Sequence, residues 1–310
     1  MKILVCDKIE PRVVKYLSKF GSVTDISDKK DKELVEKEII DSSIVVVRSS
    51  TIISKELIET SNELKIIARA GVGVDNIDID AATDNDVYVV TAPLSNIVSV
   101  AELTVGLVIS IARNIVPANL SMKDGEWNRS QFSGIELFEK KLGLVGFGKV
   151  GKLVADRLLA FGMEIGVYDP YIDSVVEPFI HYEFLDQLLI SSDVVSLHLT
   201  KTPETVNLIS KEKLDLLKKD AIFINTSRGG IVDEEALLQK KEIYGFGLDV
   251  YSTEPPEYTS DLLSTSGITL PHIGASTKEA QLRAGLDIVK SIEKILDGEK
   301  DIAINSLDIK

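Results

Sequence analysis

The sequence predicts an α/β protein with two doubly wound parallel sheets, one in each of two domains. The chain has 310 residues, enough for about two domains of ordinary size. Hydrophobic residues make up 44% and charged residues 27%, the balance of a globular protein. Short runs rich in Val and Ile alternate with segments of helical spacing, which is the rhythm of repeated strand–helix–strand units.

The first series of these units occupies about the first 95 residues. Its expected strands are 2–7, 44–47, 66–68 and 87–91. Pro11 is well placed to begin a helix running to about Phe20, because its missing N–H would be unpaired in the first turn anyway. We therefore expect one α/β unit here.

A long apolar segment, 98–115, follows this unit. Glu102 and Arg113 are its charged residues, so it is too hydrophobic all round for an ordinary surface helix. Pro117 is expected to end or kink it. We expect the segment to be buried between domains or between subunits, which favours a homodimer.

A second series begins near Lys141. Its expected strands are 141–145, 164–168, 194–197, 221–225, 246–249 and 268–270. From Lys278 to about Leu296 apolar residues return at helical spacing, and Asp297-Gly298 marks the end of that helix. We expect a domain of residues 98–274 and a discontinuous domain of 1–97 plus 275–310, with an active site in the cleft between them.

Composition excludes several classes of function. The formal net charge of −14 repels a phosphate backbone, so nucleic-acid binding is not expected. The one cysteine, Cys6, forms neither an internal disulfide nor a multi-thiolate metal site, and we expect no metal. The start lacks the apolar region of a signal peptide, and no stretch reaches the ~18 apolar residues of a membrane span. We expect a soluble, cytoplasmic protein with no membrane partner.

A glycine motif marks the second series. Gly146, Gly148 and Gly151 follow the apolar run 142–145 and precede a helical segment. In such a motif the first glycine makes the tight turn, the second admits a pyrophosphate, and the third packs helix against strand. With Lys149 and Val150 between them, these residues are expected to bind a dinucleotide. The alternative is a glycine-rich turn with a helix-capping aspartate.

The next strand ends in Asp169, 18 residues after Gly151, where a carboxylate would bind both ribose hydroxyls of NAD. No Lys or Arg lies between Asp169 and Phe179 to neutralise the 2′-phosphate of NADP, while Asp173 and Glu177 add negative charge. The sequence therefore predicts NAD as the cofactor, and both sheets are expected to be Rossmann-like or flavodoxin-like.

Hydride transfer from a hydroxy acid needs a base for the hydroxyl proton, and three histidines are available. His181 lies in a polar connecting segment, which favours a surface position. His198 ends a predicted strand, where it is either a base or a structural hydrogen-bonding residue. His272 lies in a proline-fixed turn with a glycine two residues on, and it is the preferred base.

Three segments, 225–234 (NTSRGGIVDE), 248–256 (LDVYSTEPP) and 271–277 (PHIGAST), resemble the D-isomer-specific 2-hydroxyacid dehydrogenases. The resemblance implies that His272 is the acid/base, Glu254 its carboxylate partner, and Arg228 the cation that binds and polarises the substrate's carboxylate and C2 oxygen. A carboxylate beside an imidazole raises its pKa, which suits a base that becomes charged. The alternatives are a turn-capping Glu254 and an Arg228 in a surface ion pair. Further residues implied to bind the cofactor are Thr226, Ser227, Asp249 and Gly274.

Four segments, 47–51, 68–78, 95–102 and 122–129, resemble the branch of this family that acts on D-3-phosphoglycerate. The resemblance implies that the backbone around Gly71, Val72 and Gly73 binds the substrate carboxylate. It implies that three side chains bind the phosphate: Arg48, Ser49 and Arg69. Asn96 is also implied to bind substrate, and Arg129 is implied to reach into the neighbouring subunit's site. The alternative for Arg48 and Arg69 is a structural ion pair.

The expected reaction is hydride transfer from C2 of D-3-phosphoglycerate to NAD+, giving 3-phosphohydroxypyruvate for serine synthesis. The alternatives are a glyoxylate or hydroxypyruvate reductase, an NAD-sensing corepressor and a plain scaffold. Residues 197–203 replace the family's usual small residue and proline after the histidine, which puts the contacts to adenosine in doubt. The chain ends at Lys310, so no C-terminal regulatory domain and no feedback by serine are expected.

Overall fold

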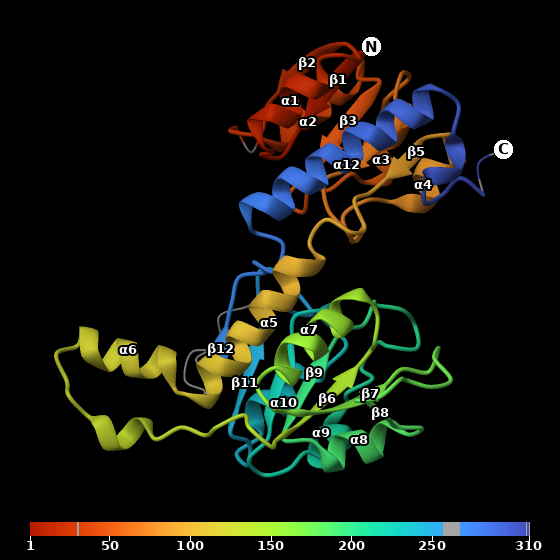
Figure 1. Cartoon of the computed structure of the whole chain (residues 1–310). Helices are drawn as coiled ribbons and strands as arrows, with labels where there is room; N and C mark the ends of the chain where they lie inside the picture. Colours follow the sequence, from red (N-terminus) through yellow and green to blue (C-terminus); the bar gives the residue numbers. More distant parts are fainter. Residues whose placement is uncertain (30, 257–266, 308, 310) are drawn as a thin grey trace. The chain divides into compact units, whose positions relative to one another are not determined.

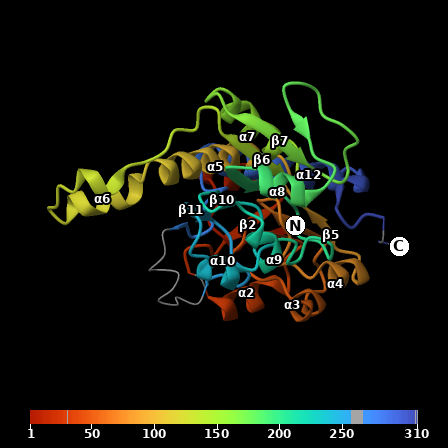
Figure 2. The ribbon, with the colours of Figure 1, turned by 90° about the horizontal axis from the view of Figure 1, so that it is seen from below.

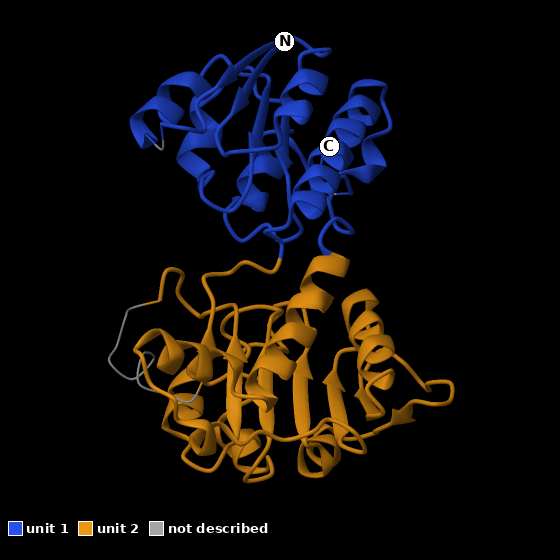
Figure 3. Ribbon diagram, turned by 60° about the vertical axis from the view of Figure 1, so that its left-hand side comes forward, with its two compact units in different colours: residues 1–96, 275–310 blue, residues 97–274 orange. Residues whose placement is uncertain are grey.

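The structure is a computed structural model that describes residues 1–29, 31–256, 267–307 and 309. The chain divides into two compact units (Figure 3). Unit 1 comprises Met1–Asn96 and Ala275–Lys310, and unit 2 comprises Ile97–Gly274.

Unit 1 is built on a five-stranded parallel sheet in the order β2-β1-β3-β4-β5. The strands are β1 (Lys2–Val5), β2 (Ser22–Asp25), β3 (Ile44–Val47), β4 (Ile66–Arg69) and β5 (Tyr88–Val90). Helices α1 (Pro11–Leu17) and α12 (Lys278–Leu296) pack on one face. Helices α2 (Lys32–Ile39), α3 (Lys55–Thr60) and α4 (Ile79–Asp84) pack on the other, and η2 (Lys300–Ile302) follows α12. This is the doubly wound, flavodoxin-like order.

The expected elements of unit 1 are present, with one strand unforeseen. Helix α1 begins at Pro11 and ends at Leu17, short of Phe20. In α12 the hydroxyl of Thr277 accepts the N–H of Ala280 at 3.1 Å, and Gly298 follows the helix with a φ of +96°. The unforeseen strand is β2, which lies at the sheet edge and alternates poorly in burial because its residues are largely polar.

Unit 2 is built on a seven-stranded parallel sheet in the order β12-β11-β10-β9-β6-β7-β8 (Figure 1). The strands are β6 (Lys141–Val145), β7 (Glu164–Tyr168), β8 (Ile180–His181), β9 (Val194–Leu197), β10 (Ile222–Asn225), β11 (Gly245–Leu248) and β12 (Ile268–Thr269). Helices α5 (Ile97–Ala112) and α7 (Lys149–Leu159) cover one face. Helices α8 (Leu185–Ser191), α9 (Lys211–Asp215) and α10 (Glu234–Gln239) cover the other. The order reverses between β6 and β9, as in a Rossmann fold, which confirms the predicted fold class.

The apolar segment breaks earlier than Pro117, so that prediction was wrong. Helix α5 ends at Ala112, Asn114 adopts a left-handed conformation with a φ of 53°, and α6 (Ile115–Lys123) leaves at 65° to α5. Pro117 lies in the first turn of α6, where a missing N–H disrupts no helical hydrogen bond. Asparagine tolerates the left-handed region better than most residues, which explains the break.

The two helices differ in burial. Helix α5 packs into the core of unit 2 through Leu107, Val108 and Ile111, whereas α6 has no buried residue. Two views show α6 and the following segment, which contains η1 (Arg129–Phe132), extending away from the sheet of unit 2 (Figures 1 and 2). Among the described residues no helix by itself is long and apolar enough to cross a membrane, although the bent α5–α6 pair passes that test by length and composition.

Candidate active site

The three residues of the expected triad follow neighbouring strands of unit 2. Arg228 follows β10, Glu254 follows β11 and His272 follows β12. Carboxyl ends of parallel strands lie along one edge of a sheet, which is where ligands of such folds bind. The fold thus brings three loops that are distant in sequence to one edge.

His272 and Glu254 are hydrogen-bonded. His272 Nδ1 lies 2.6 Å from Glu254 Oε2, and Glu254 Oε1 accepts the backbone N–H of Tyr251 at 3.1 Å. An ionised carboxylate is only an acceptor, so Nδ1 is the donor and Nε2 remains for proton exchange with a ligand. The two side chains are 45% and 36% exposed, so a ligand can reach this pair.

The pair shifts both titrations in the direction that favours the charged forms. The hydrogen bond to Glu254 raises the pKa of His272, against burial and the nearby positive charge of Arg228. For Glu254, burial acts to raise the pKa, but the hydrogen bonds from His272 and Tyr251 and the charges of His272 and Arg228 outweigh it and lower the pKa. A base held this way becomes an imidazolium at little electrostatic cost.

Asp249 anchors the turn that carries His272. Its two carboxylate oxygens accept the backbone N–H groups of Ile273 and Gly274, each at 2.8 Å. Asp249 is 1% exposed, and this burial raises its pKa. His272 has a φ of 52°, an uncommon conformation for a non-glycine residue that these two bonds fix. Sequence reasoning assigned Asp249 to the cofactor and missed its contact with this turn.

The Arg228 turn is fixed by Asn225 at the end of β10. The Asn225 side chain accepts from the N–H and hydroxyl of Ser227, at 3.1 and 2.8 Å, and donates to the carbonyl of Arg228 at 3.0 Å. A guanidinium nitrogen of Arg228 donates to the Ser227 carbonyl at 2.7 Å. Thr226 is held from the other side by a hydrogen bond of 2.7 Å between its hydroxyl and that of Thr104 on α5.

The Arg228 and Glu254 turns lie in direct contact. A Cβ on Gly229 would lie 1.7 Å from the carbonyl oxygen of Tyr251, so only glycine fits. Glu234, in the first turn of α10, accepts the N–H and hydroxyl of Ser252 at 2.7 and 2.8 Å. Sequence reasoning missed Glu234 and Asn225, although both lie inside the segment whose resemblance to the family was noted.

The glycine motif has the geometry of a dinucleotide site. Gly146 has a φ of +94°, and a Cβ there would lie 2.4 Å from the His198 carbonyl oxygen. A Cβ on Gly151 would lie 2.5 Å from the Gly146 carbonyl oxygen, whereas a Cβ on Gly148 would meet nothing within 4 Å. The first and third glycines are thus required by the protein's own packing, and the second leaves open space at the start of α7, where Lys149 and Val150 lie. These residues fit a pyrophosphate at a helix N-terminus.

Asp169 lies beside this motif. Its carboxylate accepts the N–H of Phe147 at 2.8 Å and that of Tyr171 at 3.0 Å. These bonds fix a carboxylate at the carboxyl end of β7, next to the first turn of the motif, which is the place of a ribose-binding acid.

The other two histidines lie in different surroundings. His198 Nε2 lies 3.0 Å from the Ser196 hydroxyl, and burial lowers the pKa of His198 to about 4. The ring therefore stays neutral and packs behind the glycine motif, which fits the structural alternative. His181 lies in the edge strand β8, a strand that the sequence did not predict.

The residues expected to bind substrate in unit 1 are linked through Asn76. Arg69 Nε donates to the side-chain carbonyl of Asn76 at 3.0 Å, and Asn76 donates to the carbonyls of Arg48 and Thr51 at 2.9 and 2.5 Å. A Cβ on Gly71 would lie 2.6 Å from a guanidinium nitrogen of Arg69, so this side chain lies directly against the Gly71–Gly73 loop.

Arg48 makes hydrogen bonds through both its backbone and its side chain. Its N–H donates to Asp7 at 2.6 Å, and its guanidinium donates to the carbonyl of Lys8 at 3.3 Å. Within the described part of the chain Arg48 makes no ion pair, so the structural ion pair considered for it is not seen there.

The remaining residues expected to bind substrate are Ser49, Val72, Asn96 and Arg129. Ser49 is exposed next to Arg48, and Val72 and Asn96 are half-buried in unit 1. Arg129 is exposed on η1, in the segment that extends away from the sheet of unit 2.

Comparisons with known proteins agree with this geometry. Residues 105–274 match the family described as D-isomer specific 2-hydroxyacid dehydrogenase, NAD binding domain. A D-3-phosphoglycerate dehydrogenase of Methanocaldococcus jannaschii is 44% identical over 305 residues, which cover 96% of this chain and 58% of that protein. A hydroxypyruvate reductase of Thermotoga maritima is 40% identical over 301 residues, which cover 95% of this chain and 98% of that protein.

Solved structures resemble the chain as well. The NAD+-bound 3-phosphoglycerate dehydrogenase of Entamoeba histolytica superposes with a TM-score of 0.82 at 30% identity, covering 98% of each chain. The chain thus spans 58% of the Methanocaldococcus relative and almost all of the Entamoeba structure.

Proposed function

The chain belongs to the D-isomer-specific 2-hydroxyacid dehydrogenase family, and from this we propose that it oxidises D-3-phosphoglycerate at C2 with NAD+, giving 3-phosphohydroxypyruvate for serine synthesis. The observation that carries the substrate is the linkage in unit 1 between two arginines. The side chain of Asn76 accepts from the Arg69 guanidinium and donates to the backbone carbonyl of Arg48, and Arg69 lies against the Gly71–Gly73 loop. Two guanidinium groups suit a phosphate dianion, which a small hydroxy acid such as lactate lacks.

His272 acts as the base in this proposal. Its Nε2 takes the proton of the C2 hydroxyl, and Glu254 stabilises the resulting imidazolium through Nδ1. Arg228 holds the carboxylate and polarises the C2 oxygen. When bound, NAD+ supplies the hydride acceptor.

The cofactor-binding roles follow from the geometry of unit 2. The open space at Gly148 and the first turn of α7 receive the pyrophosphate, and Asp169 binds the ribose hydroxyls. The turns that contain Thr226, Ser227, Asp249 and Gly274 border the nicotinamide side.

In unit 1 the phosphate lies with Arg48, Ser49 and Arg69, and the backbone of the Gly71–Gly73 loop binds the carboxylate. Asn96 completes this set. Such a division gives each end of the substrate its own anion-binding group.

We also propose a homodimer formed through α6. Helix α6 exposes four large apolar side chains, Ile115, Val116, Leu120 and Met122. The exposed Trp127 follows the helix. Such a patch on a soluble protein marks an interaction surface. Arg129, just beyond it, would then reach the partner's site. The one cysteine, Cys6, is free and buried, which suits a reducing cytoplasm.

An assay of NADH formation with a panel of D-hydroxy acids tests the substrate. We expect turnover of D-3-phosphoglycerate to exceed that of D-glycerate and D-lactate. Turnover of lactate or glycerate with none of phosphoglycerate would contradict the proposal. Hydroxypyruvate reduction is the second candidate. It is favoured by the similarity to the Thermotoga hydroxypyruvate reductase, because the match covers 98% of that reductase.

A further inference from the structure

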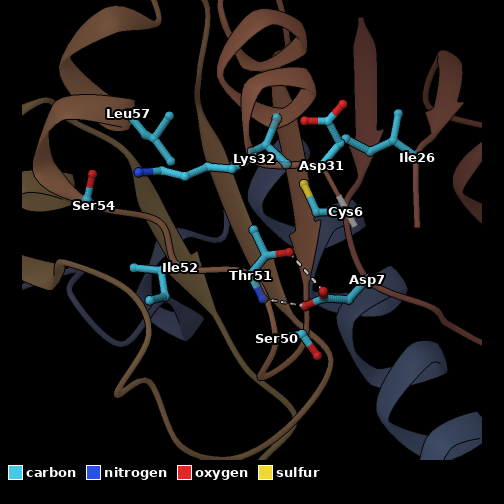
Figure 4. Close-up of a pocket in the computed structure, with 11 residues that line it drawn as sticks. Cys6, Asp7, Ile26, Asp31, Lys32, Ser50, Thr51, Ile52, Ser54 and Leu57 are labelled. Atoms are coloured by element: carbon cyan, nitrogen blue, oxygen red, sulfur yellow. Dashed lines mark hydrogen bonds between the residues drawn. The ribbon is translucent and has the colours of Figure 1, made fainter. Parts of the chain in front are cut away.

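Unit 1 contains a cavity of about 380 Å³ that has no part in the proposed reaction. It lies beyond the carboxyl ends of β1 and β3, with α2 on one side and the start of α3 on the other (Figure 4). In the strand order β2-β1-β3 the chain leaves β1 in one direction and returns to β3 in the other. Ligands of open α/β sheets bind at this kind of reversal.

The inner wall of the cavity is apolar. Cys6, Ile26, Val35 and Leu57 line it and are 5 to 8% exposed. Three residues with hydroxyl groups, Ser50, Thr51 and Ser54, also line it. A site with an apolar wall and a few polar groups is typical of a small-molecule pocket.

The charged lining residues favour a cation over an anion. Asp7 and Asp31 line the cavity together with one cation, Lys32, whose ammonium lies 3.7 Å from a carboxylate oxygen of Glu36. The lining therefore carries net negative charge and repels a phosphate dianion. Arg48 and Arg69, assigned to the substrate, do not line this cavity.

We propose that this cavity binds a small primary amine with an apolar body. The ammonium lies at the rim on the exposed carboxylate of Asp31, and the apolar body lies on Ile26, Val35 and Leu57. Figure 4 shows the carboxylate of Asp31 at the edge of the cavity and the Lys32 side chain running toward Leu57 and Ser54.

The wall of the cavity is shared with the Arg48 segment. Asp7 accepts the N–H and hydroxyl of Thr51, at 3.2 and 2.8 Å, and the N–H of Arg48 at 2.6 Å. An occupant that moves Thr51 therefore also moves the backbone of Arg48. This coupling rests on the proposed function, whereas binding in the cavity does not.

Cys6 offers a direct measure of occupancy because it is the one cysteine of the chain. Burial raises the pKa of its thiol to about 12, so its reaction with the neutral reagent methyl methanethiosulfonate is slow enough to follow. Hexylamine, hexan-1-ol and hexanoate share one apolar body and differ in charge. We expect saturable protection of Cys6 that is strongest with hexylamine and weakest with hexanoate. Equal protection by all three, none by hexylamine, or the reverse order would overturn the site.

An Asp31→Asn variant separates charge from structure. Asp31 caps α2 by accepting the N–H groups of Glu33 and Leu34, at 3.0 and 3.3 Å, and asparagine caps equally well. We expect the variant to bind hexylamine about threefold more weakly, with hexan-1-ol unchanged. Glu33→Gln, on the same helix turn but outside the cavity, is the matched control. An equal loss in both variants would overturn the role of Asp31.

The coupling has its own readout. Saturating hexylamine is expected to raise KM for D-3-phosphoglycerate with little change in kcat, and Asp31→Asn is expected to shift this effect to higher amine concentration. Protection of Cys6 without a change in KM would overturn the coupling alone. A protein that does not turn over phosphoglycerate but shows the expected protection would contradict the proposed function and leave the cavity assignment standing.

Discussion

The Glu234 carboxylate accepts two hydrogen bonds from Ser252, one from the N–H of Ser252 at 2.7 Å and one from its hydroxyl at 2.8 Å. Ser252 lies between Tyr251, whose N–H binds Glu254, and Glu254 itself. The carboxylate that orients His272 thus depends on a residue of α10 that contacts no reacting atom. The Arg228 turn leads into the same helix, so these two bonds also link the Glu254 loop to the end of the Arg228 turn.

Glu234→Ala is expected to lower kcat by about tenfold, a loss of roughly 1.4 kcal/mol of transition-state stabilisation. Because Glu254 is then less well placed, the pKa of His272 in the pH profile is expected to fall as well. Glu234→Gln keeps an acceptor oxygen and is expected to restore most of the activity. A loss of melting temperature with an unchanged pH profile would reduce Glu234 to a purely structural role.

Glu254→Gln is expected to move the pH dependence to lower pH. Oxidation needs the neutral imidazole, so kcat/KM rises with pH through the pKa of His272, which the Glu254 carboxylate raises. Without that charge the rise occurs at lower pH, and the plateau is expected to fall about tenfold to a thousandfold. In the reductive direction protonated His272 is needed, so activity is lost as pH rises, and the variant loses it at lower pH. A profile at the wild-type position would exclude Glu254 as the partner.

Gly148→Ala and Gly151→Ala are expected to fail in different ways. At Gly148 a Cβ meets no protein atom within 4 Å, so the fold is expected to be retained while KM for NAD+ rises about tenfold or more. At Gly151 a Cβ would lie 2.5 Å from the Gly146 carbonyl oxygen, so the variant is expected to lose about 1 to 3 kcal/mol of stability. Thermal denaturation and NAD+ titration of both variants separate the two effects. Equal melting temperatures would contradict the assignment.

Asn76→Ala is expected to weaken discrimination between phosphorylated and unphosphorylated substrates. The change removes the hydrogen bond to Arg69 and both bonds to the Arg48 segment. KM for D-3-phosphoglycerate is expected to rise about tenfold, with a much smaller effect on glycerate. Steady-state kinetics with both substrates make the comparison. An equal loss for both would place Asn76 in folding rather than in phosphate binding.

The sequence predicted buried strands better than edge strands. Strands β3 and β9 are nearly continuous apolar runs that are fully buried, so their composition indicates a strand in the sequence itself. β2 is polar and β8 has two residues, and both lie at sheet edges where little burial is required. The break at Asn114 was missed because proline is the stronger signal in sequence, although it is harmless in a first turn.

The candidate site was predicted unevenly for a similar reason. The triad and the glycine motif came from the resemblance and from residue types with distinct chemistry. The supporting roles of Asp249, Glu234 and Asn225 depend on backbone N–H groups that only the folded chain brings near. No pattern along the sequence encodes such contacts.

The most direct test of the central claim is the ratio of kcat/KM for 3-phosphohydroxypyruvate to that for hydroxypyruvate, measured with NADH in the wild type and in Arg48→Ala and Arg69→Ala. If the two arginines bind a phosphate, the wild-type ratio is about a hundredfold or more, and each substitution lowers it at least tenfold by loss of 3-phosphohydroxypyruvate turnover. A wild-type ratio near one, unchanged by either substitution, would contradict the account.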